Sequence, residues 1–198
     1  MDQFRWRRVE CLFQARRGLE AYEKVGPVSD VFQQLAGSYD RAGDFDGLNA
    51  LLAAHRKREP KDVQHLYWEG HLKFQDRDYP GAAALFKKFL AASGDKTANV
   101  WVARNEYLRA VLRARPADAP ALLAELEPER VPRSLRAAVA ATAGDRAELE
   151  RLVAEATENG RPLWFYSDKD FCGAIRHERW AELRAKHPDP NPRPKEGM

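Results

Sequence analysis

The chain has 198 residues, of which 44% are hydrophobic and 32% charged, and its formal net charge is +3, from 33 basic and 30 acidic residues. This length is enough for one well-formed core, and the composition excludes a wholly disordered chain. Charges of both signs alternate along most of the sequence, as is typical of solvated helix faces, so the pI of about 8.9 does not by itself indicate a nucleic-acid-binding protein.

The cysteine content and the hydropathy pattern favour a reducing, aqueous environment. Cys11 and Cys172 are too few and too far apart for a disulfide framework or a zinc site. The first residues lack the continuous apolar stretch of a signal peptide, and no segment reaches the ~18 consecutive apolar residues of a membrane span. We therefore expect a soluble, cytoplasmic protein.

Residues 1–26 form a basic, amphipathic N-terminal segment. Its apolar positions predict one helix of about twenty residues and are Phe4, Val9, Leu12, Phe13, Leu19 and Tyr22. The segment also carries five arginines, namely Arg5, Arg7, Arg8, Arg16 and Arg17. Either these arginines contact a polyanion or a membrane surface, or they form a solvated face while Phe4 and Trp6 dock on the next helix. We favour the second interpretation because three glutamates dilute the positive charge.

Residues 29–62 and 63–96 align as two ungapped windows of 34 residues. In the first window, an apolar stripe at i, i+3, i+4 and i+7 predicts a helix, and Gly43-Asp44-Phe45 supplies a turn. A second apolar helix follows and ends before Pro60. In the second window, Arg77-Asp78-Tyr79 takes the place of the turn. Each window is therefore predicted to be a helix–turn–helix unit.

A unit of this length resembles the tetratricopeptide repeat (TPR), which has a small residue at its eighth position, an aromatic at its eleventh and a proline near its end. The matching residues are Ala36, Tyr39, Phe45, Pro60, Gly70, Tyr79 and Ala82. The sequence departs from the pattern at Leu48, Lys73 and Gly94. A small residue at the helix crossing lets paired helices approach to roughly 8–10 Å. The resemblance implies a right-handed α-solenoid of antiparallel helix pairs that binds other proteins.

Helices and turns continue beyond residue 96 in a less regular pattern. Residues 97–127 are predicted to form a degenerate third pair and residues 132–159 a fourth pair. Gly144-Asp145 joins the helices of the fourth pair, and Asn159-Gly160 supplies a C-terminal cap signal.

Residues 161–187 are interpreted as a C-terminal cap, which would cover the last hydrophobic face of a solenoid. They resemble the closing segment of some bacterial TPR proteins at Asp170-Phe171, Ile175-Arg176 and Trp180-Ala181-Glu182-Leu183. The proline-rich residues 188–198 are predicted to be a flexible tail. The sequence as a whole predicts an all-α chain with a single repeat domain over residues 1–187 and capping helices at both ends.

The resemblance implies a binding groove, because the first helices of TPR units line the concave face. The candidate partner-binding residues, transferred by register, are Gln33, Gln64, Tyr67, His71, Gln75, Trp101, Asn105 and Arg109. Aromatic, arginine and amide side chains are common at recognition surfaces. For Tyr67 and Trp101, packing between helices is an equally supported alternative. One TPR subclass binds a C-terminal carboxylate, but its basic and asparagine residues are absent from the matching positions.

No pattern in the sequence indicates catalysis, a metal site or a cofactor. His65 and His71 are six residues apart, whereas zinc ligands on one helix are spaced by three or four. Cys172 and His177 lack a third, orienting group, and there is no glycine-rich phosphate loop. We expect a non-catalytic module with a protein or peptide partner, and nucleic acid is disfavoured. The alternatives are a homodimer, formed through the poorly conforming repeats or the aromatic run at 164–166, and a polyanion or membrane contact through the N-terminal arginines.

Overall fold

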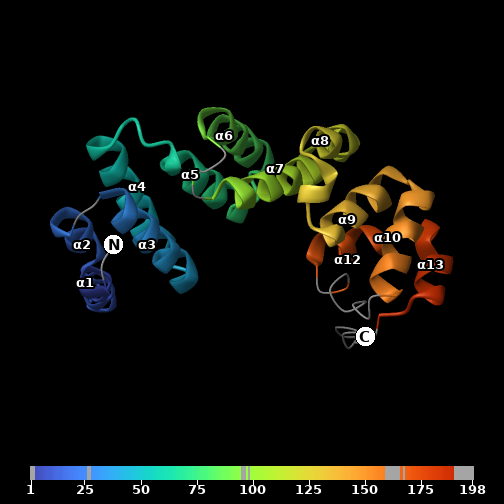
Figure 1. Ribbon diagram of the computed structural model, residues 1–198, viewed down its shortest axis with the longest axis horizontal. Helices are drawn as coiled ribbons and strands as arrows, with labels where there is room; N and C mark the ends of the chain where they lie inside the picture. The colour runs from blue at the N-terminus through green and yellow to red at the C-terminus, as the bar shows by residue number, and fades with distance from the viewer. Residues whose placement is uncertain are drawn as a thin grey trace. The chain divides into compact units, whose positions relative to one another are not determined.

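The computed structural model describes residues 3–25, 28–94, 97, 99–158, 166 and 168–189. Each regular element in these residues is an α-helix or a short 3₁₀ turn (Figure 1), which confirms the all-α class. The chain divides into two compact units, residues 1–103 and 104–198, and the division falls within helix α7, Val100–Ala114. The right-handed solenoid and the single domain over residues 1–187 stay predictions.

The first unit is built from helices that pack on their neighbours in the sequence. They are α1 (Gln3–Gln14), α2 (Gly18–Lys24), α3 (Val28–Ala42), α4 (Phe45–Arg58), α5 (Gln64–Gln75) and α6 (Tyr79–Ala92). Helices α1 and α2, α3 and α4, and α5 and α6 form pairs, and α2–α3 and α4–α5 packing joins one pair to the next. The fully buried side chains of this core include Phe32, Leu35, Leu48, Leu51, Phe86 and Phe89.

The N-terminal segment is where the predicted helices are wrong, because α1 and α2 replace the single helix of about twenty residues. The chain reverses at Arg16, whose φ is 58°. The Arg16 and Arg17 amides donate to the carbonyls of Phe13 and Leu12, at 2.8 and 2.7 Å, a pair of bonds that ends a helix in a left-handed turn. Glycine is favoured in that conformation. With arginine there, the sequence carries no signal for the break.

The expected docking of the N-terminal aromatic residues is also corrected in part. Phe4 is 85% exposed and therefore does not dock on the next helix, and Trp6 is 47% exposed. On α1, Val9 is the residue that is fully buried. The contact of α1 with the rest of the unit is thus concentrated on a narrow face.

An aspartate-capped turn recurs between paired helices. Asp44 accepts a hydrogen bond from the Gly47 amide at 2.8 Å, and Asp78, one window later, accepts one from the Gly81 amide at 3.0 Å. Asp145, at the turn between α9 and α10, accepts one from the Glu148 amide at 3.1 Å. Each bond satisfies an N–H that the helix start leaves without an intrahelical partner. The three turns lie where the sequence predicts them.

Close packing of α5 on α6 requires the small residue of the second window. A Cβ atom at Gly70 would lie 2.9 Å from Cε1 and 3.0 Å from Cδ1 of Phe86, whose ring is fully buried. The ring therefore occupies the space that a larger residue would need. Ala36, at the same offset in the first window, is also fully buried.

The second unit contains the last part of α7 and packs around α9. Its elements are α8 (Ala119–Glu125), α9 (Arg133–Ala143), α10 (Arg146–Glu158), α12 (Lys169–Ile175), α13 (Ala181–Lys186) and the 3₁₀ turns Pro116–Asp118, Pro128–Arg130 and Glu178–Trp180. Helix α9 contacts α8, α10 and α12. The indole of Trp180 and the guanidinium of Arg179 donate to the Ala141 carbonyl at 3.1 and 2.8 Å, so the C-terminal segment caps the end of α9.

Some predicted features lie outside the described residues. They are the cap signal Asn159-Gly160, most of the aromatic run Leu163-Trp164-Phe165-Tyr166, and the proline-rich tail from residue 190 onward.

Candidate functional site

The first unit carries a groove of about 700 Å³ along α3. Its lining residues are Trp6, Asp30, Gln33, Gln34, Gly37, Arg41, Trp68 and Asn99. Gln33, Gly37 and Arg41 follow one another at intervals of four residues, so they share one face of α3. The wall facing them comes from Trp68 of α5, and Trp6 of α1 and Asn99 complete the lining.

Hydrogen bonds between side-chain amides connect the elements that line the groove. Gln33 Oε1 accepts hydrogen bonds from Trp68 Nε1 at 3.3 Å and from Asn99 Nδ2 at 2.9 Å. Asn99 Nδ2 also donates to Gln64 Oε1 at 3.2 Å. The φ of Asn99 is 68°, a left-handed conformation that asparagine tolerates better than most residues. These bonds fix α3, α5 and the residue before α7 relative to one another.

Two amide atoms of α3 are buried in this region without a hydrogen-bond partner in the described part of the chain: Gln33 Nε2 and Gln34 Oε1. Gln34 is 8% exposed, and its Nε2 donates to the Trp6 carbonyl at 3.5 Å. Flipping the Gln33 amide would point its NH₂ group at two donors, and flipping Gln34 would point its oxygen at a carbonyl. The two donors thus fix the orientation of Gln33, and the Trp6 carbonyl favours that of Gln34. A buried polar group without a partner costs about 1–3 kcal/mol, so Gln33 Nε2 would gain from an added acceptor and Gln34 Oε1 from an added donor.

Two tryptophans and a glycine give the groove its apolar surface. Trp6 is half exposed, whereas Trp68 is 7% exposed and held by its bond to Gln33. A Cβ atom at Gly37 would lie 3.4 Å from Arg41 Nη1 and 4.0 Å from Trp68 Cη2, which is ordinary contact. The glycine therefore leaves about the space of one methyl group between the guanidinium and the indole.

The charges of the groove lie at its two ends. Asp30 is in the first turn of α3 and Arg41 in its last turn. Arg41 Nη2 donates to Ser38 Oγ at 3.2 Å, and its guanidinium forms no ion pair with a described residue. A cation at this place also stabilises the C-terminal end of the helix dipole. Arg41 is thus compatible with a structural role and is available to an anionic ligand.

The structure separates the predicted partner-binding residues of α3 and α5. Gln33 lines the groove, and Gln64, 6% exposed, supports it through Asn99. Tyr67 is also 6% exposed, and its ring centroid lies 6.0 Å from that of Phe86 and 5.8 Å from that of Phe89. Tyr67 therefore packs between α5 and α6, and its neighbour Trp68 faces the groove instead.

His71, Gln75 and Trp101 lie outside the groove lining. His71 Nε2 is 2.8 Å from Asp40 Oδ1, and Gln75 Nε2 is 3.2 Å from the same ring nitrogen. This cluster joins α3 to α5. The side chain of Trp101, at the start of α7, is 50% exposed.

Asn105 and Arg109 belong to the second unit. Asn105 is 6% exposed. Arg109 donates to Asp170 Oδ2 at 2.9 Å and to Glu106 Oε1 at 3.0 Å, and its Nη2 lies 3.5 Å from Asp168 Oδ2. Burial opposes the charge of Arg109, but the three carboxylates outweigh it and raise the pKa of the guanidinium. Arg109 therefore anchors the segment that leads into α12.

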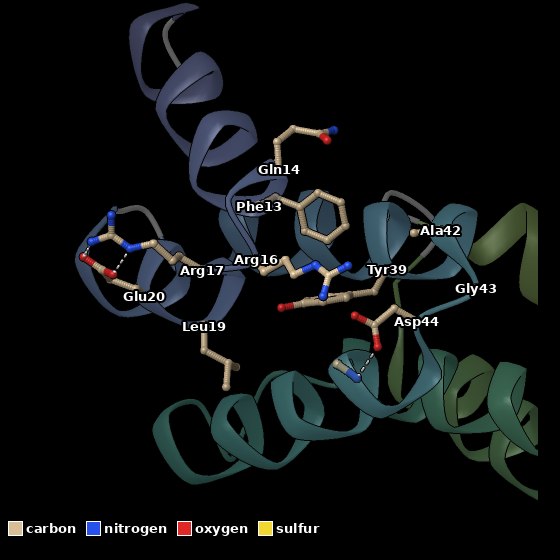
Figure 2. Close-up of a pocket in the computed structure, with 11 residues that line it drawn as sticks. Phe13, Gln14, Arg16, Arg17, Leu19, Glu20, Tyr39, Ala42, Gly43 and Asp44 are labelled. Atoms are coloured by element: carbon tan, nitrogen blue, oxygen red, sulfur yellow. Dashed lines mark hydrogen bonds and ion pairs between the residues drawn. The ribbon is translucent and has the colours of Figure 1, made fainter.

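A second hollow, also about 700 Å³, lies where the α1–α2 turn meets the α3–α4 turn (Figure 2). The rings of Phe13 and Tyr39 meet edge to face at 4.9 Å. Arg17 binds Glu20 at 2.6 Å, and hydrogen bonds from Arg17 and Lys24 lower the pKa of Glu20 to about 2. Asp44 caps α4. These charged groups serve the local turns, and we assign no ligand to this hollow.

A histidine at the centre of the first unit resembles an acid–base relay but has no access to a substrate. His55 is fully buried, its Nδ1 is 2.8 Å from the Tyr22 hydroxyl, and its Nε2 is 3.2 Å from Asp62 Oδ2. The ring stacks on Phe32 at 3.7 Å. Burial lowers the pKa of His55, although Asp62 acts in the opposite direction. The network is a structural element of the core.

Comparisons with protein-family models, with curated proteins and with solved structures found no match. Within the described residues, no helix combines the length and apolar character that crossing a bilayer requires. The same residues contain no group of three or more His, Cys, Asp or Glu side chains arranged to hold a metal ion. The interpretation of the groove therefore depends on its own geometry.

Proposed function

We propose that this protein is a non-catalytic interaction module that binds an extended segment of a partner protein in the groove along α3. The observation that carries the proposal is the buried, unpaired pair of Gln33 Nε2 and Gln34 Oε1. An extended polypeptide presents a carbonyl acceptor and an N–H donor at nearly every residue. A bound backbone would therefore offer an acceptor for Gln33 Nε2 and a donor for Gln34 Oε1.

The tryptophans would supply most of the binding energy. Indole side chains are enriched among interface residues whose truncation costs 2 kcal/mol or more. Trp68 is held in place by its hydrogen bond to Gln33, so its surface is ordered before a ligand arrives. Trp6 offers the larger exposed surface. A preformed wall of this kind lowers the entropic cost of binding.

The repeated turns support a TPR-like solenoid as the setting of this groove. The capping aspartates Asp44 and Asp78 recur at the window length, and a small residue stands at the same offset in α3 and in α5. A non-catalytic role is consistent with the lining, where Asp30 and Arg41 are the ionisable residues among those that the structure describes.

Two exposed tryptophans of the first unit provide a matched test. Trp6 lines the groove and is 47% exposed, whereas Trp101 does not line it and is 50% exposed. Affinity purification with quantitative mass spectrometry would compare the unmodified chain with Trp6→Ala and Trp101→Ala. We expect Trp6→Ala to reduce recovery of a specific partner roughly 10- to 30-fold, and Trp101→Ala to leave it unchanged.

Other results with these two variants would place the binding surface outside the groove along α3. Loss of the partner in Trp101→Ala alone would assign binding to the start of α7 and refute the groove along α3. Retention in both variants, with unchanged circular dichroism, would refute both sites. Binding to a recovered partner should then be repeated with purified components and Gln34→Leu, which removes the unpaired acceptor.

A further inference from the structure

The groove contains an anchor for an amide and, further along the same helix, a cation that forms no ion pair with a described residue. The amide anchor is Gln33 with Gln34, and the cation is Arg41. Between them lies Gly37, which keeps the path along α3 open. A ligand that follows α3 therefore meets the amide anchor, then a gap, then the guanidinium.

The spacing along α3 sets the length of that ligand. From Gln34 to Arg41 the helix advances seven residues, or about 10.5 Å at ~1.5 Å per residue. An extended peptide covers about the same distance in three residues at ~3.3 Å each. A group on the peptide that reaches Arg41 thus lies about three residues beyond the amide held by the glutamines.

The charges around the groove indicate whether the group that reaches Arg41 is acidic or basic. Arg41 offers an exposed guanidinium, whose planar fork of donors matches the two oxygens of a carboxylate. On α1, Arg7 and Arg8 follow Trp6 and are exposed, but they do not line the groove. Asp30 lies at the other end of the groove, in the first turn of α3. An acidic group is therefore favoured at the Arg41 end.

We infer that the groove recognises an acidic extended segment: an Asp or Glu side chain bound by Arg41, about three residues beyond a backbone amide held by Gln33 and Gln34, with an apolar side chain against Trp6 and Trp68. This inference rests on the proposed function and names the class of its ligand. It makes Arg41 the residue that determines specificity, and the tryptophans the residues that determine affinity.

Two other anions fit the groove less well. A C-terminal carboxylate is usually held by several donors, whereas Arg41 is the one cation among the described lining residues and the end of α3 presents carbonyl oxygens. A single-stranded nucleic acid needs a continuous basic track for successive phosphates. Asp30 interrupts such a track in this groove.

The test uses an array of C-terminally amidated octapeptides in neutral backgrounds, each with one leucine and one glutamate separated by one to five residues. Each peptide has a counterpart with glutamine in place of glutamate. The full chain, fluorescently labelled, is applied to the array, and affinities of the bound peptides are measured by fluorescence anisotropy. Arg41→Gln removes the guanidinium that is proposed to bind the glutamate. As the control, Lys57→Gln removes an exposed cation of α4 that does not line the groove.

We expect glutamate peptides of one or two neighbouring separations to bind roughly 3- to 10-fold more tightly than their glutamine counterparts, because only those place the glutamate at Arg41 when the leucine contacts the tryptophans. The ratio should fall to about one in Arg41→Gln and persist in Lys57→Gln. Equal binding of glutamate and glutamine peptides, still dependent on Trp6, would refute the acidic preference and leave the proposed function standing. If the Arg41→Gln variant still prefers glutamate peptides, Arg41 is not the residue that binds the glutamate.

Two further outcomes would overturn the ligand class. If no peptide binds while an oligothymidine binds with the same dependence on Trp6 and Arg41, the ligand is a nucleic acid and the proposed function fails as well. If free C-terminal acids bind and amidated glutamate peptides do not, the carboxylate is that of a chain terminus.

Discussion

Two helix-interior glycines allow the packing of α5 on α6 to be measured. Replacing Gly70 by alanine places a Cβ atom 2.9 Å from a ring atom of the buried Phe86, whereas Gly37→Ala meets its nearest neighbours at 3.4 and 4.0 Å. Both changes gain about 0.8–1 kcal/mol of helix propensity. Overpacking of a buried site costs about 1–3 kcal/mol. We therefore expect Gly70→Ala to be less stable than Gly37→Ala by about 1–3 kcal/mol.

Urea unfolding followed by circular dichroism would measure this difference, with the slope of each transition checked for two-state behaviour. Phe86→Leu provides the control, because removing the ring edge should reduce the cost of Gly70→Ala in a double-mutant cycle. Equal stability of the two alanine variants would refute the close approach of α5 and α6 at Gly70. An unchanged cost in the Phe86→Leu background would show that another neighbour is responsible.

Three further changes test the pH response and the anchoring contacts. Burial lowers the pKa of His55 in the folded protein, so the unfolded chain binds the proton first as the pH falls. The free energy of unfolding should therefore decrease below pH ~6.5. Urea unfolding at a series of pH values would show this decrease, and His55→Gln should make the pH dependence weaker. Asp78→Ala should cost about 0.5–2 kcal/mol, since the Gly81 amide loses its acceptor, and an unchanged urea midpoint would contradict the cap. Arg109→Gln should cost about 1–3 kcal/mol, because the buried Asp170 loses one of its two arginine partners, and thermal unfolding would detect the loss.

The helix pairs could be predicted where the sequence carries both a period and a turn signal. Gly43-Asp44 and Gly144-Asp145 mark helix ends with a residue that accepts positive φ and a residue that caps the next helix, so the turns lie where they were predicted. The break at Arg16 could not be predicted in this way. Arginine is disfavoured in a left-handed conformation, and the apolar periodicity runs on through the turn.

The groove could be predicted only in outline. Register places Gln33 on the face of α3 that lines the groove, and extending its four-residue interval through Gly37 leads to Arg41 as well. Tyr67 and Trp68 are adjacent aromatic residues, and periodicity alone does not decide which of them faces the groove; the packing of α5 on α6 decides it. No sequence rule brings Trp6 of α1 to this place, because that contact follows from the unpredicted turn before α2.

The turn at Arg16 also affects how often α1 is packed in the position that brings Trp6 to the groove. Helix α1 carries Trp6 but has Val9 as its fully buried residue, and the helix after the turn begins without a side-chain cap at Arg17. Elements with little buried surface open at low free-energy cost. We therefore expect α1 to exchange its amide hydrogens faster than α5 in the free protein and to become protected when a ligand binds. The measured affinity would then equal the intrinsic affinity multiplied by the fraction of molecules in which α1 is in place.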